Sequence, residues 1–491
     1  MKDRCLTILF LLCFMQAAAA QTPPALQQFL AQKNMKGASF SFMAKEVNTG
    51  EVLYSYEAER ELTPASVLKL VTTATALELL GAEHRFATTL EYDGQITDSI
   101  LKGNLYIKGS GDPTLGSSHF AADRANYTPE RNTFIPPWIA ALKKKGVRRI
   151  TGSVIADESV FDTEGVSMKW ISEDLGSYYG AGCYGLSVFD NLYKLYVNTG
   201  APGSRPELVS CLPPMPSLRF HNYLTAASVA TDSSYIVGAP FSNERYLYGV
   251  VPANEKRFLL RGDMPDPPLF LAQYLQACLQ REGISVDGSA TCFRLLQEAH
   301  QAPRAERTVL ATTYSPTLRE ILSVTNKRSH NLYADALLKT LGLRYKVKPG
   351  EVISSTAKGV QVVAAYWREK GLDASSLWMF DGSGLSASDK LTTTFVCDLL
   401  VYMATKSRLS AAFVASLPKA GQEGSVANFL KASPLQGKAL LKSGGMSRVR
   451  AYAGYITQGD KRYAVALIAN SYAGENRTLL AGLEKLLLSL F

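Results

Sequence analysis

The chain has 491 residues, of which 46% are hydrophobic and 19% are charged. This composition is typical of a globular protein, and the length predicts two to four domains. The formal net charge of +9 at pH 7 suits a polyanionic surrounding such as a cell wall or a membrane surface. The basic residues form no dense stripe and no nucleic-acid motif, so we expect no nucleic acid among the partners.

Residues 1–20 are typical of a secretory signal peptide. Lys2 and Arg4 form a basic start, residues 6–15 are an apolar run, and residues 17–20 are small and suit cleavage. An uncleaved anchor is the alternative, but the run is short for a membrane-spanning helix. No later stretch approaches about 18 uninterrupted apolar residues. We therefore expect the mature protein to be exported to the periplasm.

The cysteines and histidines carry little information about the site. Cys5 and Cys13 of the seven cysteines lie in the signal segment, which leaves an odd number and at least one unpaired thiol. Cys278 and Cys292 are close enough in sequence to pair, and five buried thiols are the alternative. There is no Cys-x-x-Cys, and the five histidines are scattered without metal-ligand spacing. The sequence therefore predicts neither a metal nor another cofactor.

The first predicted element is a β-hairpin at residues 38–56, split by a turn at residues 48–50. Thr63 and Pro64 then suit the N-cap and the first residue of a helix that runs to Leu80 and stops at Gly81. From residue 88 to residue 304, short β-like runs alternate with glycine, proline and aspartate turns, and few long helical patterns occur. We interpret this stretch as a largely β insertion, with one or two nested subdomains.

Helical periodicity returns after the insertion, and the chain closes with a second hairpin and a helix. The predicted helices lie near residues 316–325, 331–341, 357–370, 391–404 and 409–416. The hairpin strands are predicted at residues 450–457 and 463–470, and the last helix starts near residue 476. Leucines form one apolar face of that helix. We expect it to pack on the sheet; binding to a membrane surface is the alternative, for which it has too few basic residues.

Ser66 and Lys69 lie three residues apart on the first predicted helix and therefore share a face. At a helix start, unpaired N–H groups and the helix dipole can hold a developing oxyanion. A serine hydroxyl needs a base, and a lysine can serve if burial lowers its pKa. Three other Ser-x-x-Lys matches begin at residues 99, 355 and 416, but only Ser66 follows Pro-Ala and opens an apolar helix. Ser66 is therefore the candidate nucleophile, with an ordinary first-turn serine as the alternative.

The segment Ser329-His330-Asn331 lies between two predicted helices. Ser329 could relay a proton to a leaving amine, and Asn331 offers both a donor and an acceptor to a peptide amide. His330 is predicted to point away. The alternative for this segment is a helix N-cap with a polar turn.

The segment Lys442-Ser443-Gly444-Gly445 precedes the closing hairpin. Lys442 and Ser443 could bind a substrate carboxylate. Gly444 and Gly445 let the backbone approach a ligand closely, and the N–H of Gly445 could be a second oxyanion donor. A glycine-rich turn between strands is the alternative.

Together, in this order, the three segments are the signature of serine penicillin-recognising enzymes. The chain resembles the class C low-molecular-mass penicillin-binding proteins, the D-Ala-D-Ala carboxypeptidase/endopeptidase family also called penicillin-binding protein 4 or peptidase family S13. Ser443 stands where many relatives have threonine, and it keeps the hydroxyl. Asp381-Gly-Ser-Gly-Leu-Ser386 is among the most specific matches. The likeness rests on residues 64–69, 105–115, 157–161, 179–182, 329–331, 381–386, 417–421 and 442–444.

The resemblance implies an α+β fold. A peptidase domain, an antiparallel sheet flanked by helices, is formed by residues 21–87 and 305–491 and split by the β-rich insertion at 88–304. It implies hydrolysis of D-Ala-D-Ala bonds or D-Ala cross-links in peptidoglycan stem peptides, and acylation of Ser66 by β-lactam antibiotics. In relatives, an acidic residue of the insertion faces the side chain of the third peptide residue, and Asp157 matches that position. The sequence does not fix the oligomeric state, and a homodimer is one of the alternatives.

The resulting hypothesis gives each candidate residue a role. Neutral Lys69 takes the proton of Ser66, the N–H groups of Ser66 and Gly445 hold the oxyanion, and Ser329 protonates the leaving amine. Lys442 keeps the site positive, Asn331 holds the substrate amide, and Ser443 helps to hold a terminal carboxylate. A β-lactamase with fast deacylation and a non-catalytic cell-wall-binding scaffold of the same fold are the alternatives.

Overall fold

The two ends of the chain meet in one five-stranded antiparallel sheet of order β2-β1-β22-β21-β20. The structure, a computed structural model, describes residues 23–303 and 306–491, so the predicted signal segment lies outside the described residues. Both predicted hairpins are confirmed, and β1 pairs with β22 from Ser39↔Asn470 to Glu46↔Tyr463. The strands are β1 (Ser39–Glu46), β2 (Val52–Tyr56), β20 (Ala439–Met446), β21 (Val449–Gln458) and β22 (Lys461–Asn470).

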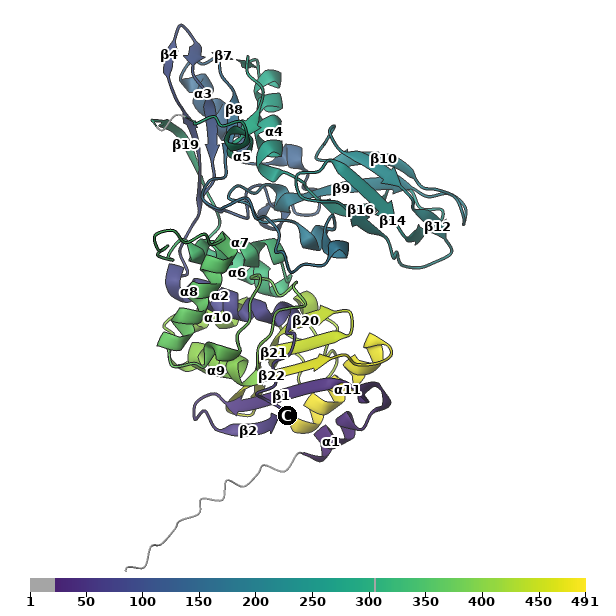
Figure 1. Cartoon of the computed structure of the whole chain (residues 1–491). Coiled ribbons are helices and arrows are strands. Elements are labelled where there is room, and N and C mark those ends of the chain that lie inside the picture. The colour runs from purple at the N-terminus through teal and green to yellow at the C-terminus, as the bar shows by residue number, and fades with distance from the viewer. Residues whose placement is uncertain (1–22, 304–305) are drawn as a thin grey trace, which may run out of the picture.

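Helices cover both faces of this sheet (Figure 1), and alternate residues of each strand face opposite cores. In β21, for example, Ala453 and Tyr455 face one core, whereas Tyr452 and Ile456 face the other. The larger helical layer contains α2 (Lys69–Leu80), α6 (Leu318–Lys327), α7 (Asn331–Gly342), α8 (Ser355–Glu369), α9 (Thr393–Thr405) and α10 (Ser410–Ser416). The second layer contains α1 (Pro24–Leu30) and α11 (Asn476–Leu490).

The final helix, α11, packs on the sheet as predicted. Its leucines at positions 479, 483, 486, 487 and 490 are buried in the same core as strands β1, β21 and β22. Within residues 23–303 and 306–491, none of the helices combines the length and the apolar character that a membrane span requires.

The helix that carries Ser66 begins differently from the prediction. Its first turn is a 3-10 turn, η2 (Ala65–Leu68), which continues into α2. Thr63 does not cap it, because its hydroxyl donates to the carbonyl of Ala387 (3.1 Å). The N-cap prediction was therefore wrong, since a tertiary contact takes the hydroxyl. Gly81 ends the helix with a positive φ of 85°, as expected of a terminating glycine.

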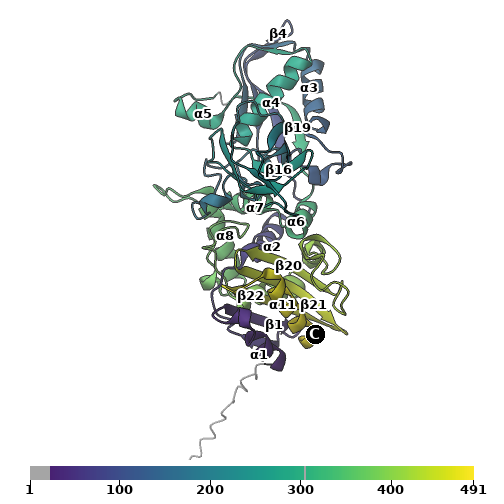
Figure 2. The same cartoon turned by 90° about the vertical axis from the view of Figure 1, so that its right-hand side faces the viewer.

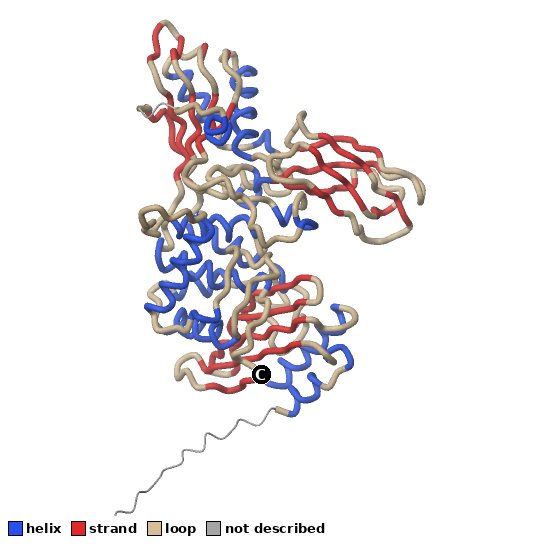
Figure 3. The backbone as a smooth tube through the Cα atoms, in the orientation of Figure 1, coloured by secondary structure: helices blue, strands red, loops and turns tan. Residues whose placement is uncertain are grey.

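Between β3 (Ala87–Tyr92) and β19 (Thr308–Tyr314) the chain forms the β-rich lobes that project from the helical layer (Figures 1 and 3). β3 and β19 pair antiparallel, so the chain leaves and returns on neighbouring strands. They belong to a five-stranded sheet of order β18-β8-β6-β3-β19, with β6 (Leu105–Lys108), β8 (Val154–Asp157) and β18 (Thr291–Cys292). A four-stranded sheet of order β17-β7-β5-β4 contains β4 (Gln95–Thr97), β5 (Ile100–Lys102), β7 (Arg149–Ile150) and β17 (Ser285–Val286).

Three smaller sheets form the second β-rich lobe, seen from the side in Figure 2. The first has the order β10-β9-β16 and contains β9 (Leu192–Asn198), β10 (Glu207–Leu212) and β16 (Phe258–Asp263). The second has the order β11-β14-β13 and contains β11 (Arg219–Asn222), β13 (Tyr235–Val237) and β14 (Glu244–Tyr248). The third pairs β12 (Thr225–Ala227) with β15 (Val250–Pro252).

The insertion also contains helices that the sequence analysis did not predict, namely α3 (Ile135–Lys144), α4 (Pro267–Arg281) and α5 (Phe293–Glu298). Pro-Pro pairs begin α3 and α4. Prolines favour turns, but the first helical turn needs no N–H and tolerates them, so these helices leave a weak signal in the sequence. Of the two alternatives for the cysteines, the Cys278–Cys292 pair does not form: all five described cysteines are free thiols, of which four are buried and Cys211 is partly exposed.

Candidate active site

Lys69 and Ser66 lie where η2 passes into α2, at the edge of β20. The Lys69 side chain is completely buried, whereas Ser66 is partly exposed. The Lys69 Nζ atom lies 2.9 Å from Ser66 Oγ, 2.7 Å from Asn331 Oδ1 and 2.6 Å from the carbonyl oxygen of Ser383. The amine therefore has three oxygen neighbours and no access to solvent.

Burial lowers the pKa of Lys69 to about 8, because the charged form loses its hydration. The carboxyls of Asp335, Asp381 and Asp389 oppose this and raise the pKa. Burial and the charge of Asp381 in turn raise the pKa of Asp335 to about 8, which weakens its pull on the lysine. About one tenth of Lys69 is therefore neutral at pH 7 and can accept a proton, far more than for an ordinary lysine.

The hydrogen bonds show how a neutral amine would be oriented. A neutral amine has two N–H groups and one lone pair. The carbonyl of Ser383 accepts only, and the amide of Asn331 is fixed because its Nδ2 donates to the carbonyl of Tyr179 (2.8 Å), which turns Oδ1 toward Lys69. These two acceptors take the two N–H groups. The lone pair is left for the hydroxyl proton of Ser66.

A second amine and hydroxyl pair lies on the β20 side of the site. Lys442 Nζ donates to Ser329 Oγ (2.9 Å) and to the carbonyl of Ser443 (2.6 Å), and the Lys442 side chain is buried. Burial first, and then the charge of Lys69, lower the pKa of Lys442 well below its usual range. Ser329 has a left-handed φ of 57°, immediately before α7 begins at Asn331. The pair can pass a proton, as general acid catalysis requires.

The segment 442–445 forms the end of strand β20, not a turn, so that earlier alternative was wrong. Gly444 packs against the nucleophile's backbone, and a Cβ there would lie 3.1 Å from the nitrogen of Ser66. Gly445 is exposed, as an oxyanion donor must be to reach substrate. The hydroxyl of Ser443 lies 2.7 Å from that of Ser425. The three predicted motifs therefore converge on one site.

The loop at residues 381–386 supports the site in a way that sequence reasoning missed. The Asp381 carboxylate accepts hydrogen bonds from the N–H groups of Ser383, Gly384 and Ser386, and from Trp170 Nε1 (2.7 Å). This compact turn aims the Ser383 carbonyl at Lys69. The family match of the loop signalled its importance, but a main-chain acceptor leaves no side-chain signal in the sequence.

Replacing Gly384 with alanine is expected to slow acylation by penicillin about 10²-fold, because the loop must shift and carry the Ser383 carbonyl away from Lys69. Gly384 has a φ of +75°, and a Cβ there would overlap the carbonyl oxygen of Ala65. Gly371→Ala is the matched control, since Gly371 has a φ of +84° but open space around a Cβ. It should cost only about 1 kcal/mol of stability. Acylation rates and thermal unfolding of both variants test this, and equal acylation rates would contradict it.

Asp157 is not joined to this site by any hydrogen bond or ion pair between described residues. Its carboxylate is buried at the end of β8, where it accepts hydrogen bonds from Arg307 (2.7 Å) and from Ser159. In this structure Asp157 binds Ser159 of the insertion and Arg307, which directly precedes β19.

A cavity of about 450 Å³ lies beside the site, between α7 and the insertion. Ser329 and Asn331 line it together with Tyr179, His119 and Asp190. His330, which the sequence analysis placed away from the chemistry, also lines the cavity.

The fold and the converging motifs define a serine peptidase of the penicillin-recognising class. The model of the D-Ala-D-Ala carboxypeptidase 3 (S13) family matches residues 23–486, and the chain belongs to this family. The resemblance found in the motifs is therefore confirmed, as are the α+β penicillin-binding fold and the activity of a serine-type D-Ala-D-Ala carboxypeptidase.

Relatives match along most of their length. The D-alanyl-D-alanine carboxypeptidase of an Actinomadura species is 27% identical over 460 residues, covering 91% of this chain and 81% of the relative. The D-alanyl-D-alanine carboxypeptidase DacB of Haemophilus influenzae is 26% identical over 451 residues, covering 90% and 88%. The crystal structure of penicillin binding protein 4 (dacB) from H. influenzae has the same fold, with a TM-score of 0.78 and 23% identity over 92% of this chain and 96% of that one.

Proposed function

We propose that Ser66 is the nucleophile of a D-Ala-D-Ala carboxypeptidase and DD-endopeptidase that acts on peptidoglycan stem peptides and is acylated by β-lactam antibiotics. The observation that carries the proposal is the buried amine of Lys69, which lies 2.9 Å from Ser66 Oγ with its other neighbours restricted to acceptors. This arrangement suits a general base and a weak nucleophile that it activates.

In the acylation step, Ser66 Oγ attacks the carbonyl carbon of the penultimate D-Ala, and its proton moves to Lys69. The N–H groups of Ser66 and Gly445 hold the oxyanion. The C–N bond then breaks and an ester to Ser66 remains. The proton that Lys69 took up reaches the leaving amine through Ser329 and Lys442, which leaves Lys69 neutral again. In the second step water attacks the ester and gives a proton to Lys69, and Lys69 returns it to Ser66 Oγ as the ester C–O bond breaks and the shortened peptide leaves as the acid.

Asn331 and Ser443 bind substrate in this proposal, the former through its amide and the latter beside a terminal carboxylate. The negative charge of that carboxylate would raise the pKa of the nearby Lys442 amine, against the lowering that burial causes. The site would thereby become positive when substrate enters. Asp157 remains a proposed binding residue only if its ion pair with Arg307 opens on binding.

We also propose the domain division made from the sequence: a peptidase domain of residues 21–87 and 305–491, split by the insertion of residues 88–304. The sheet shared by both chain ends supports a split peptidase domain. The chain leaves and returns on the paired strands β3 and β19, although β19 (Thr308–Tyr314) itself belongs to the sheet of the insertion. Residues 304 and 305, where the insertion is proposed to end, lie outside the described residues. The composition of residues 1–20 supports export to the periplasm.

Endopeptidase activity is favoured by the cavity between α7 and the insertion. Its volume of about 450 Å³ gives room for peptide beyond the scissile bond, next to Ser329 and Asn331. A cross-linked peptide needs such room, whereas a terminal D-Ala does not.

Mass spectrometry of purified muropeptides tests the proposal. Pentapeptides should lose the terminal D-Ala, and cross-linked dimers should be cut to monomers, when incubated with the wild-type protein but not with Ser66→Ala. The lifetime of the penicilloyl adduct separates a peptidase from a β-lactamase, because a β-lactamase releases the adduct within its turnover time. Intact muropeptides together with rapid penicillin hydrolysis would refute the proposal, as would intact muropeptides with no adduct.

A further inference from the structure

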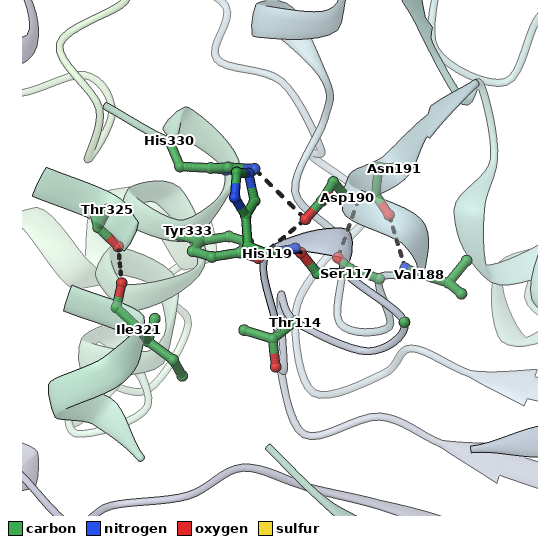
Figure 4. A network of polar contacts seen from close by, with 12 residues as sticks. Thr114, Ser117, His119, Val188, Asp190, Asn191, Ile321, Thr325, His330 and Tyr333 are labelled. Atoms are coloured by element: carbon green, nitrogen blue, oxygen red, sulfur yellow. Dashed lines mark hydrogen bonds and ion pairs between the residues drawn. The ribbon is translucent and has the colours of Figure 1, made fainter. Parts of the chain in front are cut away.

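His119, Asp190 and His330 come together on the wall of the cavity, although more than 60 residues separate each from the next along the chain (Figure 4). Each offers one donor atom, and the three donor atoms lie within 4.8 Å of one another. His119 and Asp190 belong to the insertion, whereas His330 lies between Ser329 and Asn331 of the site. No spacing rule in the sequence could have predicted this cluster, because the fold alone assembles it.

The geometry of the pair His330 and Asp190 does not suit an ordinary hydrogen bond. Their Nε2 and Oδ1 atoms are 3.5 Å apart, which is longer than the usual N–H···O range of about 2.7–3.2 Å. Two ligands of a tetrahedral zinc ion, each about 2.0–2.1 Å from the metal, lie roughly 3.4 Å apart. The observed separation is close to that expected between two ligands of one such ion.

Neighbouring side chains fix the orientation of Asp190 and His330, as metal ligands require. The Asp190 carboxylate accepts a hydrogen bond from Tyr333 OH (3.0 Å), and the Tyr333 oxygen lies 2.7 Å from Ser117 Oγ, whose hydroxyl can donate to it. The ring of His330 stacks on that of Tyr333, with centroids 3.9 Å apart. Such outer contacts orient metal ligands and raise their affinity. The other ring nitrogen of His330, Nδ1, is buried and has no hydrogen-bond partner among the described residues.

The backbone around Asp190 is also specialised. Phe189, Asp190 and Asn191 all have left-handed φ angles of 52–58°, a conformation that non-glycine residues avoid unless surrounding contacts impose it. The Asn191 side chain imposes it by accepting from Val188 N (3.0 Å) and donating to the carbonyl of Gly182 (2.8 Å). This turn presents the Asp190 carboxylate to the two histidines.

We propose that His119, Asp190 and His330 bind one divalent transition-metal ion of the Zn²⁺ class, which clamps the insertion to the loop that carries Ser329 and Asn331. Two imidazoles and one carboxylate are a ligand set that zinc accepts, and three protein ligands leave a fourth position facing the cavity. The three donor atoms lie within 4.8 Å of one another, and rotation of the half-buried His119 side chain can bring them to the shorter separation that one ion requires. The proposal concerns binding of the ion and does not depend on the acyl-enzyme chemistry.

Titration of the metal-free protein, lacking residues 1–20, with Zn²⁺ and with Co²⁺ tests this proposal. We expect one equivalent to bind, and the midpoint of thermal unfolding to rise with Zn²⁺ concentration because the folded state binds the ion. The Co²⁺ protein should show the visible absorption of nitrogen and oxygen ligation without a thiolate charge-transfer band. His119→Ala, Asp190→Asn and His330→Ala should each lose the equivalent.

His221→Ala is the matched control, because His221 also lies beside a carboxylate, 2.6 Å from Glu244, but belongs to no three-ligand group among the described residues. It should keep the bound equivalent. Retention of that equivalent in His119→Ala or Asp190→Asn would overturn the proposal, as would absence of binding to the wild-type protein. Should the variants fail to fold, X-ray absorption of the zinc-loaded wild type decides: a shell of nitrogen and oxygen supports the site, and a sulfur shell overturns it.

Discussion

Ser66→Ala is expected to abolish covalent labelling by a fluorescent penicillin and to reduce peptidase activity by about 10⁵-fold or more, because no other group can form the ester. Ser66 is partly exposed and its Oγ contacts Lys69 Nζ, so its loss should leave the fold intact. Labelling, gel fluorescence and a carboxypeptidase assay measure the effect. Mass spectrometry of the labelled wild-type peptide should place the adduct on Ser66.

Ser99→Ala is the control for that experiment. Ser99 and Lys102 have the same Ser-x-x-Lys spacing but are both exposed, in the hairpin formed by β4 and β5. This variant should label and cleave like the wild type. An adduct that persists in Ser66→Ala would assign the chemistry to another serine.

The site residues that belong to short motifs could be predicted from the sequence, because each motif is recognised from its residue types and from the helix or strand in which it lies. Ser66, Ser329 and Lys442 are examples: the structure joins Lys69 to Ser66 and to Asn331, and Lys442 to Ser329. The flanking hairpins and helices were predictable for the same reason, since alternation and helical periodicity are local properties.

Contacts made by the main chain and by distant segments were not predictable. The carbonyl of Ser383 is a main-chain group, so no pattern of residue types reveals it. Thr63 does not cap the helix as expected, because its hydroxyl donates to the carbonyl of Ala387. Asp157 was assigned by its position in a family pattern, which does not reveal its ion pair with Arg307. The strand character of β20 was hidden by its glycines, which local rules associate with turns.

His330 shows the same limit most clearly. Its neighbours Ser329 and Asn331 were predicted because a motif names them, whereas its own partners, His119 and Asp190, come from the insertion. The pairing depends on how the β-rich lobes pack against α7. Only the three-dimensional structure contains that information.

Lys69→Ala is expected to reduce the second-order rate of acylation by penicillin by about 10²–10⁴-fold, the usual contribution of a general base. The amine is buried with Asn331 and the Ser383 carbonyl as its other neighbours, and neither of these groups can take its place as the base. A small primary amine added to the Lys69→Ala protein should restore part of the rate, which a purely structural role would not allow. Lys102→Ala, at the exposed Ser-x-x-Lys match, should acylate normally.

The pH dependence of acylation in the wild type follows from the same amine. Burial lowers the pKa of Lys69 to about 8, and only the neutral form accepts the proton of Ser66. Below that pKa, each unit fall in pH reduces the neutral fraction, and with it the rate, about tenfold; above it, the rate levels off. Stopped-flow acylation from about pH 6 to about pH 9 should therefore rise with unit slope to a plateau. A rate that does not change with pH would show that the proton of Ser66 goes to a group other than Lys69. The carboxyls of Asp335, Asp381 and Asp389 raise the pKa of Lys69 against the effect of burial, so this lysine is expected to titrate within the range measured.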